Sequence, residues 1–589
     1  MQSIFEKRKT EYEQSAQIFK KQDQQWSFYR IIFFVLLAVL VVYFANQREA
    51  IFLGITLVIG FFVFGLMIKK HQKIGFTYKN FKFLAQINSE ELQRLEGKFS
   101  AFPDGKIFEE ELHPYTSDLD IFGKNSVFQF INRTSTISGS RKLANWLKKS
   151  ATKIDIEKRQ EKSAELAKNI DFLQNFQSAG RHFKQNETQI LALKNWISSE
   201  NVFKIPVYLP ILLSAISVFA IVCFFVFDLP HLVYFIPLAI NMFFLKQNFA
   251  KISDLLTQMQ SFLPEIQAVA KLIELIETQK FENLDLQKLQ SQFTRSQACT
   301  AIKNLAFYLQ MIEYRQNAYF YIFFNSLTLW DLQFSLRLEK WKNAHQNDID
   351  FWFESVAEFD ALQSLAGFAF ANPDFCVPII SSQTFDYQAT KLGHPLIRAS
   401  KRTVNDLSLS NTGICMLITG SNMSGKSTFL RTVALNGVLA LAGAVVCAAS
   451  FRVSQVQIFT SMRTQDSLSE QVSSFYAELK RIRQLLDRLE NKENVFYFLD
   501  EILKGTNSTD RNLGAKAIIR QLHKSAVSGL LSTHDLELGE LANDHDFVQN
   551  YSFNSEIVDG KLLFDYRLTK GVCKTFNASQ LMRQIGIEM

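Results

Sequence analysis

Long stretches of apolar residues without any charge are the most prominent pattern in this chain of 589 residues. A helix that spans a bilayer needs roughly 20 apolar residues, with about 17 to 25 tolerated. The runs occur as two pairs, and only a short polar turn separates the members of each pair, which is hard to explain for buried helices. We therefore predict two transmembrane helical hairpins, with buried core helices as the alternative. The four runs are Ile31 to Ala45, Ile51 to Ile68, Ile205 to Phe227 and Leu229 to Leu245.

Elsewhere the spacing of apolar residues changes along the chain. In residues 117–200 and 251–365, Leu and Phe recur at three- and four-residue intervals with few breakers, a pattern typical of amphipathic helices. From about residue 386, short apolar runs alternate with helical segments, which is typical of a parallel α/β sheet.

One further apolar segment is harder to assign. Tyr319 to Phe334 is very apolar, but Asn325 and Asp331 interrupt it. Because of these interruptions we predict a helix of the protein core, with a third membrane element as the alternative.

Composition excludes several classes of protein. Hydrophobic residues make up 47% and charged residues 21% of the chain, which excludes a disordered or fibrous protein. Lysine and arginine total 64 against 57 acidic residues, a net charge of +7, which is compatible with nucleic acid or anionic lipid but diagnostic of neither. The six cysteines include no CxxC pair, so we expect neither a zinc site nor a disulfide framework.

Basic residues flank each hairpin at its open end. The turns, in contrast, carry Arg48 offset by Glu49 in the first hairpin and Asp228 in the second. Because Lys and Arg are enriched on the cytoplasmic side of membrane helices, we predict a multi-pass protein of the cell inner membrane with both turns outside and the rest in the cytoplasm. The flanking cations are Lys20, Lys21, Arg30, Lys69, Lys70, Lys73, Lys204, Lys246 and Lys251.

A complete GxxxxGKS motif follows the apolar run from Met416 to Thr419 and precedes a helical segment. In such a loop the backbone N–H groups and the helix N-terminus bind phosphate. Lys426 is expected to reach the β- and γ-phosphates of ATP, and the Ser427 hydroxyl is expected to bind Mg²⁺. The predicted nucleotide-binding residues are Gly420, Ser421, Asn422, Met423, Ser424, Gly425, Lys426, Ser427 and Thr428.

Two later strands end in candidate catalytic residues. The strand from Val495 to Leu499 leads into Asp500, a predicted Mg²⁺ ligand, and Glu501, which is placed to orient and deprotonate the attacking water. The strand from Gly529 to Ser532 leads to His534, which can sense the γ-phosphate. Together these elements predict an ATPase of the ABC-like class.

Several longer strings resemble the MutS family of DNA mismatch repair ATPases. TGSNMSGKST at Thr419 is close to the family's TGPNMGGKST, and LDEILKGTNSTD at Leu499 is close to MDEIGRGTSTYD. STHDLEL at Ser532 resembles ATHYHEL, and VSSFYAEL at Val472 resembles the signature loop STFMVEM. The resemblance implies a homodimer that binds ATP, Mg²⁺ and DNA, and in which Ser473 reaches the nucleotide of the partner subunit.

Other parts of the chain depart from the family pattern. We expect the mismatch-reading and connector domains to be missing, because only a membrane hairpin precedes the helical core. The clamp between the lever helices has little room, at about residues 280–300. Arg402 to Val404 occupy the stretch where the family has an aromatic residue that stacks on adenine.

The predicted fold is an α/β P-loop ATPase domain of the ABC-like class, preceded by a mostly α-helical core and lever region with two transmembrane hairpins. The predicted division is a charged N-terminal helix (1–27), the first hairpin (28–70), a cytoplasmic connector (71–113), the helical core (114–200), the second hairpin (201–250), the lever region (251–385) and the ATPase domain (386–589).

These features predict a membrane-anchored, dimeric MutS-like ATPase that couples ATP binding and hydrolysis to movement of helical levers, with DNA binding implied by the resemblance. One alternative is a subunit of an ABC-type transporter, since Leu468 to Gln471 is similar to that family's LSGGQ, although both glycines are missing. The other alternative is a MutS-like membrane scaffold that acts on a protein client.

Overall fold

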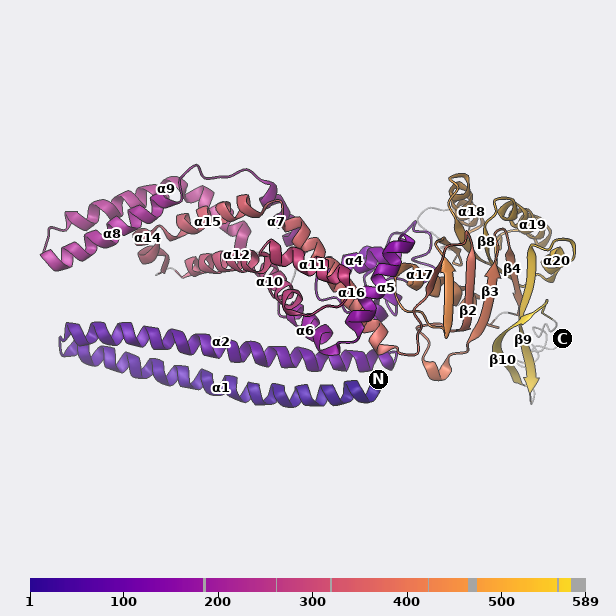
Figure 1. Cartoon of the computed structure of the whole chain (residues 1–589), viewed down its shortest axis with the longest axis horizontal. Helices are drawn as coiled ribbons and strands as arrows, with labels where there is room; N and C mark the ends of the chain where they lie inside the picture. The colour runs from indigo at the N-terminus through magenta and orange to yellow at the C-terminus, as the bar shows by residue number, and fades with distance from the viewer. Residues whose placement is uncertain are drawn as a thin grey trace.

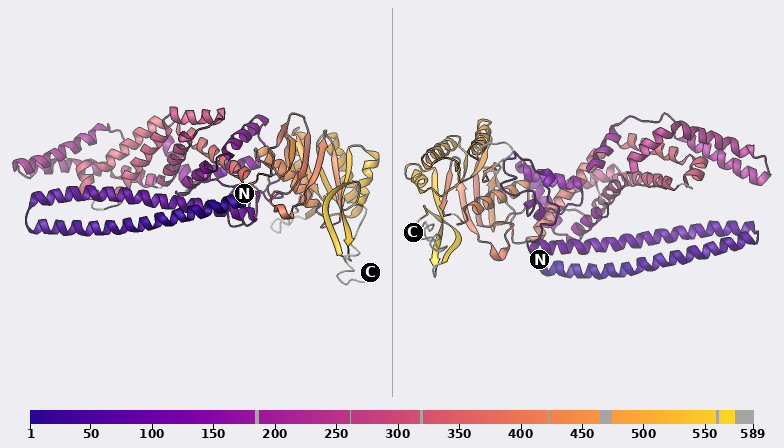
Figure 2. Two further views of the ribbon diagram at one scale, coloured as in Figure 1. Left: turned by 60° about the horizontal axis from the view of Figure 1, so that its bottom comes forward. Right: turned by 180° about the vertical axis from the view of Figure 1, so that it is seen from behind.

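The computed structural model describes residues 1–183, 187–260, 262–317, 320–421, 423–463, 474–558 and 561–573. The molecule is elongated (Figure 1). A domain with β-sheets forms one end, helices form the middle, and two helical projections extend toward the opposite end. Both projections point the same way in the other views (Figure 2).

The first projection is an antiparallel pair of long helices, α1 (Gln2–Asn46) and α2 (Ala50–Leu95). The charged segment and the first apolar run form one continuous helix, because no proline or glycine interrupts them. Helix α2 continues past the second apolar run into the segment predicted as a connector. The two helices approach closely at Gly60, where an added Cβ would lie 2.2 Å from the Leu37 side chain.

The second projection contains α8 (Tyr208–Phe227) and α9 (Leu232–Gln260). The chain reverses between them at Asp228, whose backbone is left-handed with φ +50°. Helix α9 continues ten residues beyond residue 250, where the sequence analysis places the end of the second hairpin.

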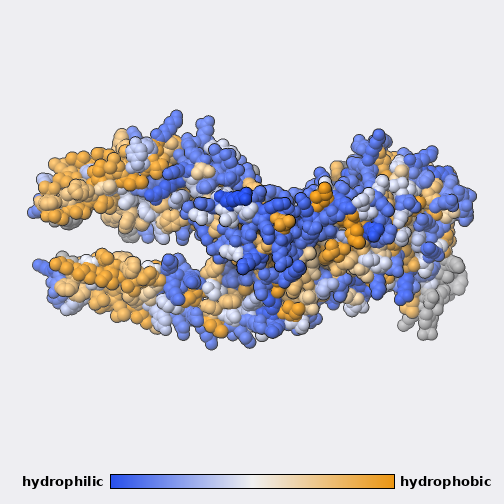
Figure 3. All heavy atoms as spheres, in the orientation of Figure 1, coloured by the Kyte–Doolittle hydropathy of each residue, from blue (hydrophilic) through white to orange (hydrophobic). Residues whose placement is uncertain are grey.

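Apolar side chains cover the outer ends of both projections (Figure 3). In the most apolar part of α1 none of the residues is buried, and in that of α2 only 6% are buried. By length and composition, three helices of the described residues could cross a membrane: Gln2–Asn46, Ile51–Leu95 and Leu232–Leu256. The remaining predicted span, Ile205 to Phe227, corresponds to α8, in which the apolar helix Tyr208–Phe224 is shorter than these three.

The prediction of one core helix from Tyr319 to Phe334 is wrong. The described part of this segment forms two short helical pieces, η3 (Tyr321–Asn325) and α14 (Ser326–Thr328), which precede α15 (Trp330–His345). The helix breaks at Leu329, which has a left-handed backbone with φ +50°. Ile322, Phe323 and Phe324 face outward. In contrast, Leu329, Leu332 and Phe334 are buried in the hydrophobic core, so only the second part of the segment is a core element.

The middle of the molecule is a helical core centred on α16 (Ile349–Ala371), whose Asp360 is fully buried. The Asp360 carboxylate accepts hydrogen bonds from the backbone of Ser135 (3.0 Å) and of Thr136 (2.8 Å), and so fixes the start of α4 against α16. The other helices are η1 (Lys106–Phe108), α3 (Val127–Ile131), α4 (Ile137–Lys148), α5 (Lys153–Ala167), α6 (Ile170–Arg181), α7 (Glu187–Ser198), α10 (Leu263–Thr278), α11 (Leu284–Arg295), α12 (Ala298–Glu313) and η2 (Tyr314–Gln316).

The β-containing domain has two sheets. A six-stranded sheet in the order β10-β9-β4-β8-β7-β6 is parallel except for β10, as the sequence predicts. A four-stranded sheet in the order β1-β5-β2-β3 is mostly antiparallel and was not predicted. The strands are β1 (Ile379–Ser381), β2 (Asp386–Leu392), β3 (Asn405–Ser410), β4 (Cys415–Gly420), β5 (Ser450–Ser454), β6 (Gln457–Ser461), β7 (Val495–Asp500), β8 (Ser528–Thr533), β9 (Val548–Val558) and β10 (Lys561–Lys570).

Helix α17 (Lys426–Ala442) is buried along most of its length and packs against strands of the six-stranded sheet and against α4 and α5. It therefore joins the β-containing domain to the helical core. The remaining helices of the domain are η4 (Ala399–Lys401), α18 (Ser474–Glu490), α19 (Ser508–Lys524), η5 (Leu536–Glu540) and α20 (Leu541–Asp544).

Residues just before the helical core form a second connection between the core and the β-containing domain. The Asp118 carboxylate accepts hydrogen bonds from the hydroxyl of Thr460 on β6 (2.7 Å) and from the backbone N–H of Met462 (3.1 Å). Asp120 pairs with Arg463 at 2.7 Å and with Arg431 of α17 at 3.5 Å. Movement of α17 or of the end of β6 would therefore be transmitted to the helical core through Asp118 and Asp120.

Candidate nucleotide-binding site

The predicted phosphate-binding loop connects the end of β4 to the start of α17. Gly425 caps the helix with φ +103°, a conformation that glycine adopts without strain. At Gly420 a Cβ would lie 2.8 Å from the Ser424 hydroxyl and 2.9 Å from the carbonyl oxygen of Phe553. Both glycines are thus required by the local geometry of the loop.

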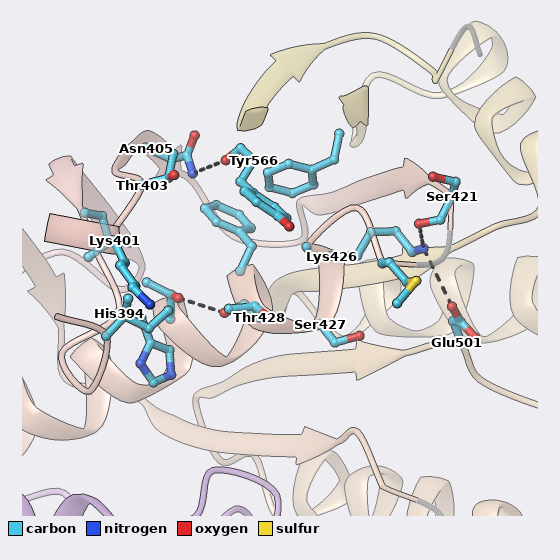
Figure 4. A pocket seen from close by; sticks show the side chains of 17 residues that line it. His394, Lys401, Thr403, Asn405, Ser421, Lys426, Ser427, Thr428, Glu501 and Tyr566 are labelled. Carbon is cyan, nitrogen blue, oxygen red and sulfur yellow. Dashed lines mark hydrogen bonds and ion pairs between the residues drawn. The ribbon is translucent and has the colours of Figure 1, made fainter. Parts of the chain in front are cut away.

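Lys426 lies inside this loop and is only 4% exposed. Its ammonium donates to the carbonyl oxygens of Gly420 (2.8 Å) and Ser421 (3.0 Å), and it lies 3.7 Å from the Glu501 carboxylate (Figure 4). Burial lowers the pKa of Lys426, while Glu501 and Asp500 oppose that shift. The loop therefore holds a cation whose present partners are mainly backbone carbonyls.

The other loop residues divide into exposed and buried positions. Met423, Ser427 and Thr428 are exposed, and all three line a cavity of about 420 Å³. The hydroxyls of Ser421 and Ser424 are buried and have no hydrogen-bond partner among the described residues. Unpaired buried donors at a helix N-terminus are suited to an anionic ligand. Asn422 lies outside the described residues.

Parallel pairing of β7 and β8 brings the two predicted catalytic strand ends together, with Asp500 opposite Ser532. The Ser532 hydroxyl donates a hydrogen bond to the Asp500 carboxylate. The backbone N–H of Glu501 donates to the Ser532 carbonyl (2.9 Å), with φ +49° at Glu501. This backbone conformation directs the glutamate toward the phosphate loop.

Glu501 lies close to two lysines and a histidine. Its carboxylate lies 3.1 Å from the Lys504 ammonium and 3.7 Å from the His534 imidazole, in addition to Lys426. Burial by itself would raise the pKa of Glu501, but the hydrogen bond and charge of Lys504, with the charges of Lys426 and His534, hold it below its ordinary value. Glu501 is therefore an ionised carboxylate that can accept a proton.

The structure brings Lys426, Glu501 and His534 together, but Ser473 lies outside the described residues. Glu501 lines the cavity with Lys426, whereas Asp500 borders a neighbouring depression with Met462, Arg463 and Lys504.

The cavity also has walls that sequence reasoning missed, formed by Phe553 of β9 and Tyr566 of β10. Tyr566 lies at a register shift in β10 with φ +55°, and its ring would be 3.0 Å from a Cβ at Gly425. Asn405 fixes this turn by donating to the Tyr566 carbonyl (3.1 Å) and accepting from the Leu568 N–H (2.8 Å). No local motif marks Tyr566, because a distant strand places it there.

Arg402 does not face the cavity as an adenine contact, since its guanidinium donates to the Ile397 carbonyl (2.6 Å). Thr403 and His394 do line the cavity. Burial, together with the charges of Arg431 and Arg402, lowers the pKa of His394 to about 4. His394 is therefore a neutral imidazole near pH 7.

Comparison with known proteins agrees with this geometry. A family model described as MutS domain V matches residues 416–586. DNA mismatch repair protein MutS of Brevibacillus brevis is 34% identical over 229 residues, which are 37% of this chain and 26% of that protein. The corresponding protein of Porphyromonas gingivalis is 33% identical over 228 residues, which are 37% of this chain and 25% of that protein. The C-terminal part of the chain is therefore similar to the MutS family.

The family-model match covers the six-stranded sheet and every predicted site residue from Gly420 to His534. It begins within β4, so strands β1, β2 and β3, the helical core and both projections lie before it. The chain spans about a quarter of the length of the curated MutS relatives it matches.

Proposed function

We propose that this protein is a membrane-anchored MutS-like ATPase. The observation that carries this proposal is the grouping of Lys426, Glu501 and His534 at one loop, in a domain that matches MutS domain V. The loop supplies a cation and unpaired hydroxyls for phosphate, and Glu501 supplies an ionised base beside them.

In the proposed reaction a water molecule attacks the γ-phosphorus of ATP, and the bond to the leaving ADP oxygen breaks. Lys426 exchanges its contacts with the loop carbonyls for the β- and γ-phosphate oxygens. Glu501 orients the water and takes its proton. His534, which lies beside Glu501, is placed to contact the γ-phosphate. The products are ADP and inorganic phosphate.

Mg²⁺ fits the oxygen donors of this site. Within the described ranges no group of three or more His, Cys, Asp or Glu side chains could hold a metal ion, but Mg²⁺ needs only one or two protein ligands beside phosphates and water. The Ser427 hydroxyl and the Asp500 carboxylate would hold it. When bound, Mg²⁺ neutralises phosphate charge.

Tyr566 and Phe553 are suited to the base of the nucleotide. Both rings line the cavity, where Figure 4 labels Tyr566, and aromatic faces stack on nucleobases. Tyr566 therefore takes the role for which the segment from Arg402 to Val404 offers no aromatic ring.

Membrane anchoring is supported by how charge is distributed on the first projection. Arg30 contacts His71 at 2.7 Å, and His71 lies 3.1 Å from Asp23, so the charges gather at the base of the apolar helices. Beyond this cluster the outward residues of both helices are apolar as far as the turn. Such a boundary is suited to the cytoplasmic face of a bilayer.

Dimer formation and lever movement follow from the family resemblance. ATP would lie between the phosphate loop of one subunit and the Ser473 loop of the other. Closure of this interface would move α17 and the end of β6, and Asp118 and Asp120 would pass that movement to the helical core. Mixing Ser473→Arg subunits with Lys426→Ala subunits should restore activity at one site per mixed dimer, whereas each variant alone stays inactive.

DNA is the client that the names of the relatives suggest, since they are DNA mismatch repair proteins. The decisive experiment measures ATP hydrolysis by the detergent-solubilised protein alone and with duplex, mismatched or branched DNA. Stimulation by any of these DNAs supports a DNA transaction. Hydrolysis that no DNA changes would favour a scaffold with a protein client.

A further inference from the structure

The segment between α12 and α15 is irregular, and an anchor made of α8 and α9 does not require it. Residues 320–329, the intervening segment, contain η3, α14 and the left-handed Leu329. The sequence has no charged residue between Arg315 and Asp331. The segment is too short to span a bilayer, so it must turn back where it enters.

Its large side chains point away from the protein. Ile322, Phe323 and Phe324 are 59%, 70% and 52% exposed, whereas Asn325 is 2% exposed. Consecutive exposed apolar side chains of this size mark a surface that contacts something other than water. The pattern is inverted relative to a soluble core, with the polar residue inside and the aromatic residues outside.

The inner side of the segment is held by polar residues of the second projection. Asn241 of α9 donates to the carbonyl oxygens of Ser326 (3.0 Å) and Leu327 (3.2 Å). Ser214 of α8 donates to the carbonyl of Thr328 (2.6 Å). Both donors are buried, and each lies in an uncharged, mostly apolar stretch of its helix. They supply hydrogen bonds to the carbonyls of a helix that ends after a single turn.

Hydroxyl groups of the segment itself donate hydrogen bonds to carbonyls four residues earlier in the chain. The Ser326 hydroxyl donates to the Ile322 carbonyl (2.6 Å), and the Thr328 hydroxyl donates to the Phe324 carbonyl (2.6 Å). Irregular backbone is tolerated at membrane depth only where its polar groups are satisfied by protein or by water in a cavity. The carbonyls from Ile322 to Thr328 that carry these bonds meet that requirement.

The depth of the segment follows from its neighbours on α9. Arg315, which precedes the segment, lies over the ring of Phe249 and pairs with Asp331, which follows it. The turn contacts Asn241, eight residues along α9, or roughly 12 Å at 1.5 Å per residue. A hydrocarbon layer is about 30 Å thick. The segment thus reaches into one half of that layer, beside α8 and α9 (Figure 1).

We propose that residues 320–329 form a re-entrant membrane element, with Ile322, Phe323 and Phe324 in contact with lipid acyl chains of the cytoplasmic leaflet. This proposal rests on the membrane anchoring of α8 and α9 argued above. The element is continuous with α15, which runs back to the helical core (Figure 1). The membrane would then hold the helical core at a third place.

The test places one environment-sensitive fluorophore at a time in the full chain, without the six native cysteines. The protein is reconstituted into vesicles of phosphatidylcholine and phosphatidylglycerol, with or without bromine on the acyl chains. Phe323→Cys probes the segment. Phe219→Cys on α8 (70% exposed) reports the anchor, and Ile154→Cys on α5 (64% exposed) reports the aqueous core.

Brominated chains should quench the fluorophores at positions 323 and 219 strongly and the fluorophore at position 154 hardly at all. Quenching at 219 without quenching at 323 would overturn the re-entrant element and leave the anchor intact. No quenching at 219 would overturn the anchor itself. Protection of position 323 from both brominated lipid and aqueous iodide would mean that protein covers it, which also overturns the proposal. Ile322→Cys repeats the measurement if the Phe323 variant does not fold.

Discussion

Helices α17 and α8 are both rich in apolar residues, yet the molecule uses them in opposite ways. In α17 every residue from Thr432 to Ala442 is buried, between the six-stranded sheet and the helical core. In α8, Leu212 and Phe219 are 53% and 70% exposed. The absence of charge alone does not distinguish a membrane helix from a core helix. What differs is side-chain size, since the buried part of α17 is rich in Ala and Leu while α8 carries Phe and Ile on its outer surface.

The two ends of the molecule also differ in where their polar groups lie. In the β-containing domain, Glu501 and His534 lie together at strand ends, and Glu501 faces a cavity. In the second projection, Ser217 and Asn241 are fully buried while their apolar neighbours face outward. The first arrangement is suited to a protein domain in water, and the second is suited to lipid.

The largest expected effect is on access to the two turns. Cysteines placed at Gln47 and Asp228, without the native six, should react with a membrane-impermeant thiol reagent in intact cells. Cysteines at Lys73 and Lys280 should react only after lysis. All four positions are exposed in the protein, so the membrane alone determines the difference.

Labelling of Lys73 from outside would reverse the predicted orientation. Protection of both turns after lysis without denaturant would mean that the projections are buried in protein. In that case α8 and α17 would differ only in which part of the protein covers them.

The next effect concerns hydrolysis at the nucleotide end. Glu501→Gln should slow turnover on the order of 10²-fold or more while ATP binding persists, because a general base typically contributes 10² to 10⁴. Turnover and binding of a fluorescent ATP analogue are measured in parallel. Glu540→Gln, an exposed glutamate of η5, is the matched control. An unchanged rate for Glu501→Gln would remove this residue from the catalytic role.

A smaller effect is expected when the charge beside Glu501 is removed. In the native protein Lys504 lowers the pKa of Glu501, so the carboxylate stays ionised to a lower pH than an ordinary glutamate. Lys504→Ala raises this pKa toward its ordinary value, and activity should then be lost at a higher pH as the solution is acidified. The pH profile of turnover is measured, with the exposed Lys524→Ala as the charge control. If the acidic limbs of the pH profiles of the native protein and Lys504→Ala were identical, ionisation of Glu501 would not limit the rate.

The sequence predicts the local structure around the GxxxxGKS motif well because that structure depends on short local patterns. Gly420, Gly425 and Lys426 need their spacing to form the loop, and a strand and helix lie on either side as expected. Glu501 and His534 follow strands whose parallel pairing places their ends at one edge. Tyr566 could not be predicted, since its place depends on a register shift in β10 and on Asn405, 161 residues away.

The antiparallel sheet was missed for a similar reason. Strands β1 and β5 pair across more than seventy residues, and β1 has only three residues, so neither leaves a local repeat. In the segment around Leu329 the sequence is misleading, because Asn325 and Asp331 interrupt the apolar run and so favour a core helix. They are indeed buried, and they pair with each other at 3.2 Å, but the aromatic residues beside them are not. The hydrogen-bond donors of α8 and α9, which hold the inner side of the segment, explain why its aromatic residues face outward.

The smallest expected effect tests those donors directly. Asn241→Leu removes the hydrogen bonds to the Ser326 and Leu327 carbonyls and should cost about 1 kcal/mol of stability, since side-chain hydrogen bonds in membranes average roughly 0.6 and reach about 1.7 kcal/mol. Asn248→Leu is the matched control on the same helix, because the hydrogen bond that Asn248 donates within the described part of the chain is to the Phe244 carbonyl of α9 itself. Unfolding is followed in detergent micelles. The loss should be larger for Asn241, because leucine there leaves carbonyls of a neighbouring segment without donors, whereas the helix itself satisfies Phe244. Equal losses would show that α9 does not support the intervening segment.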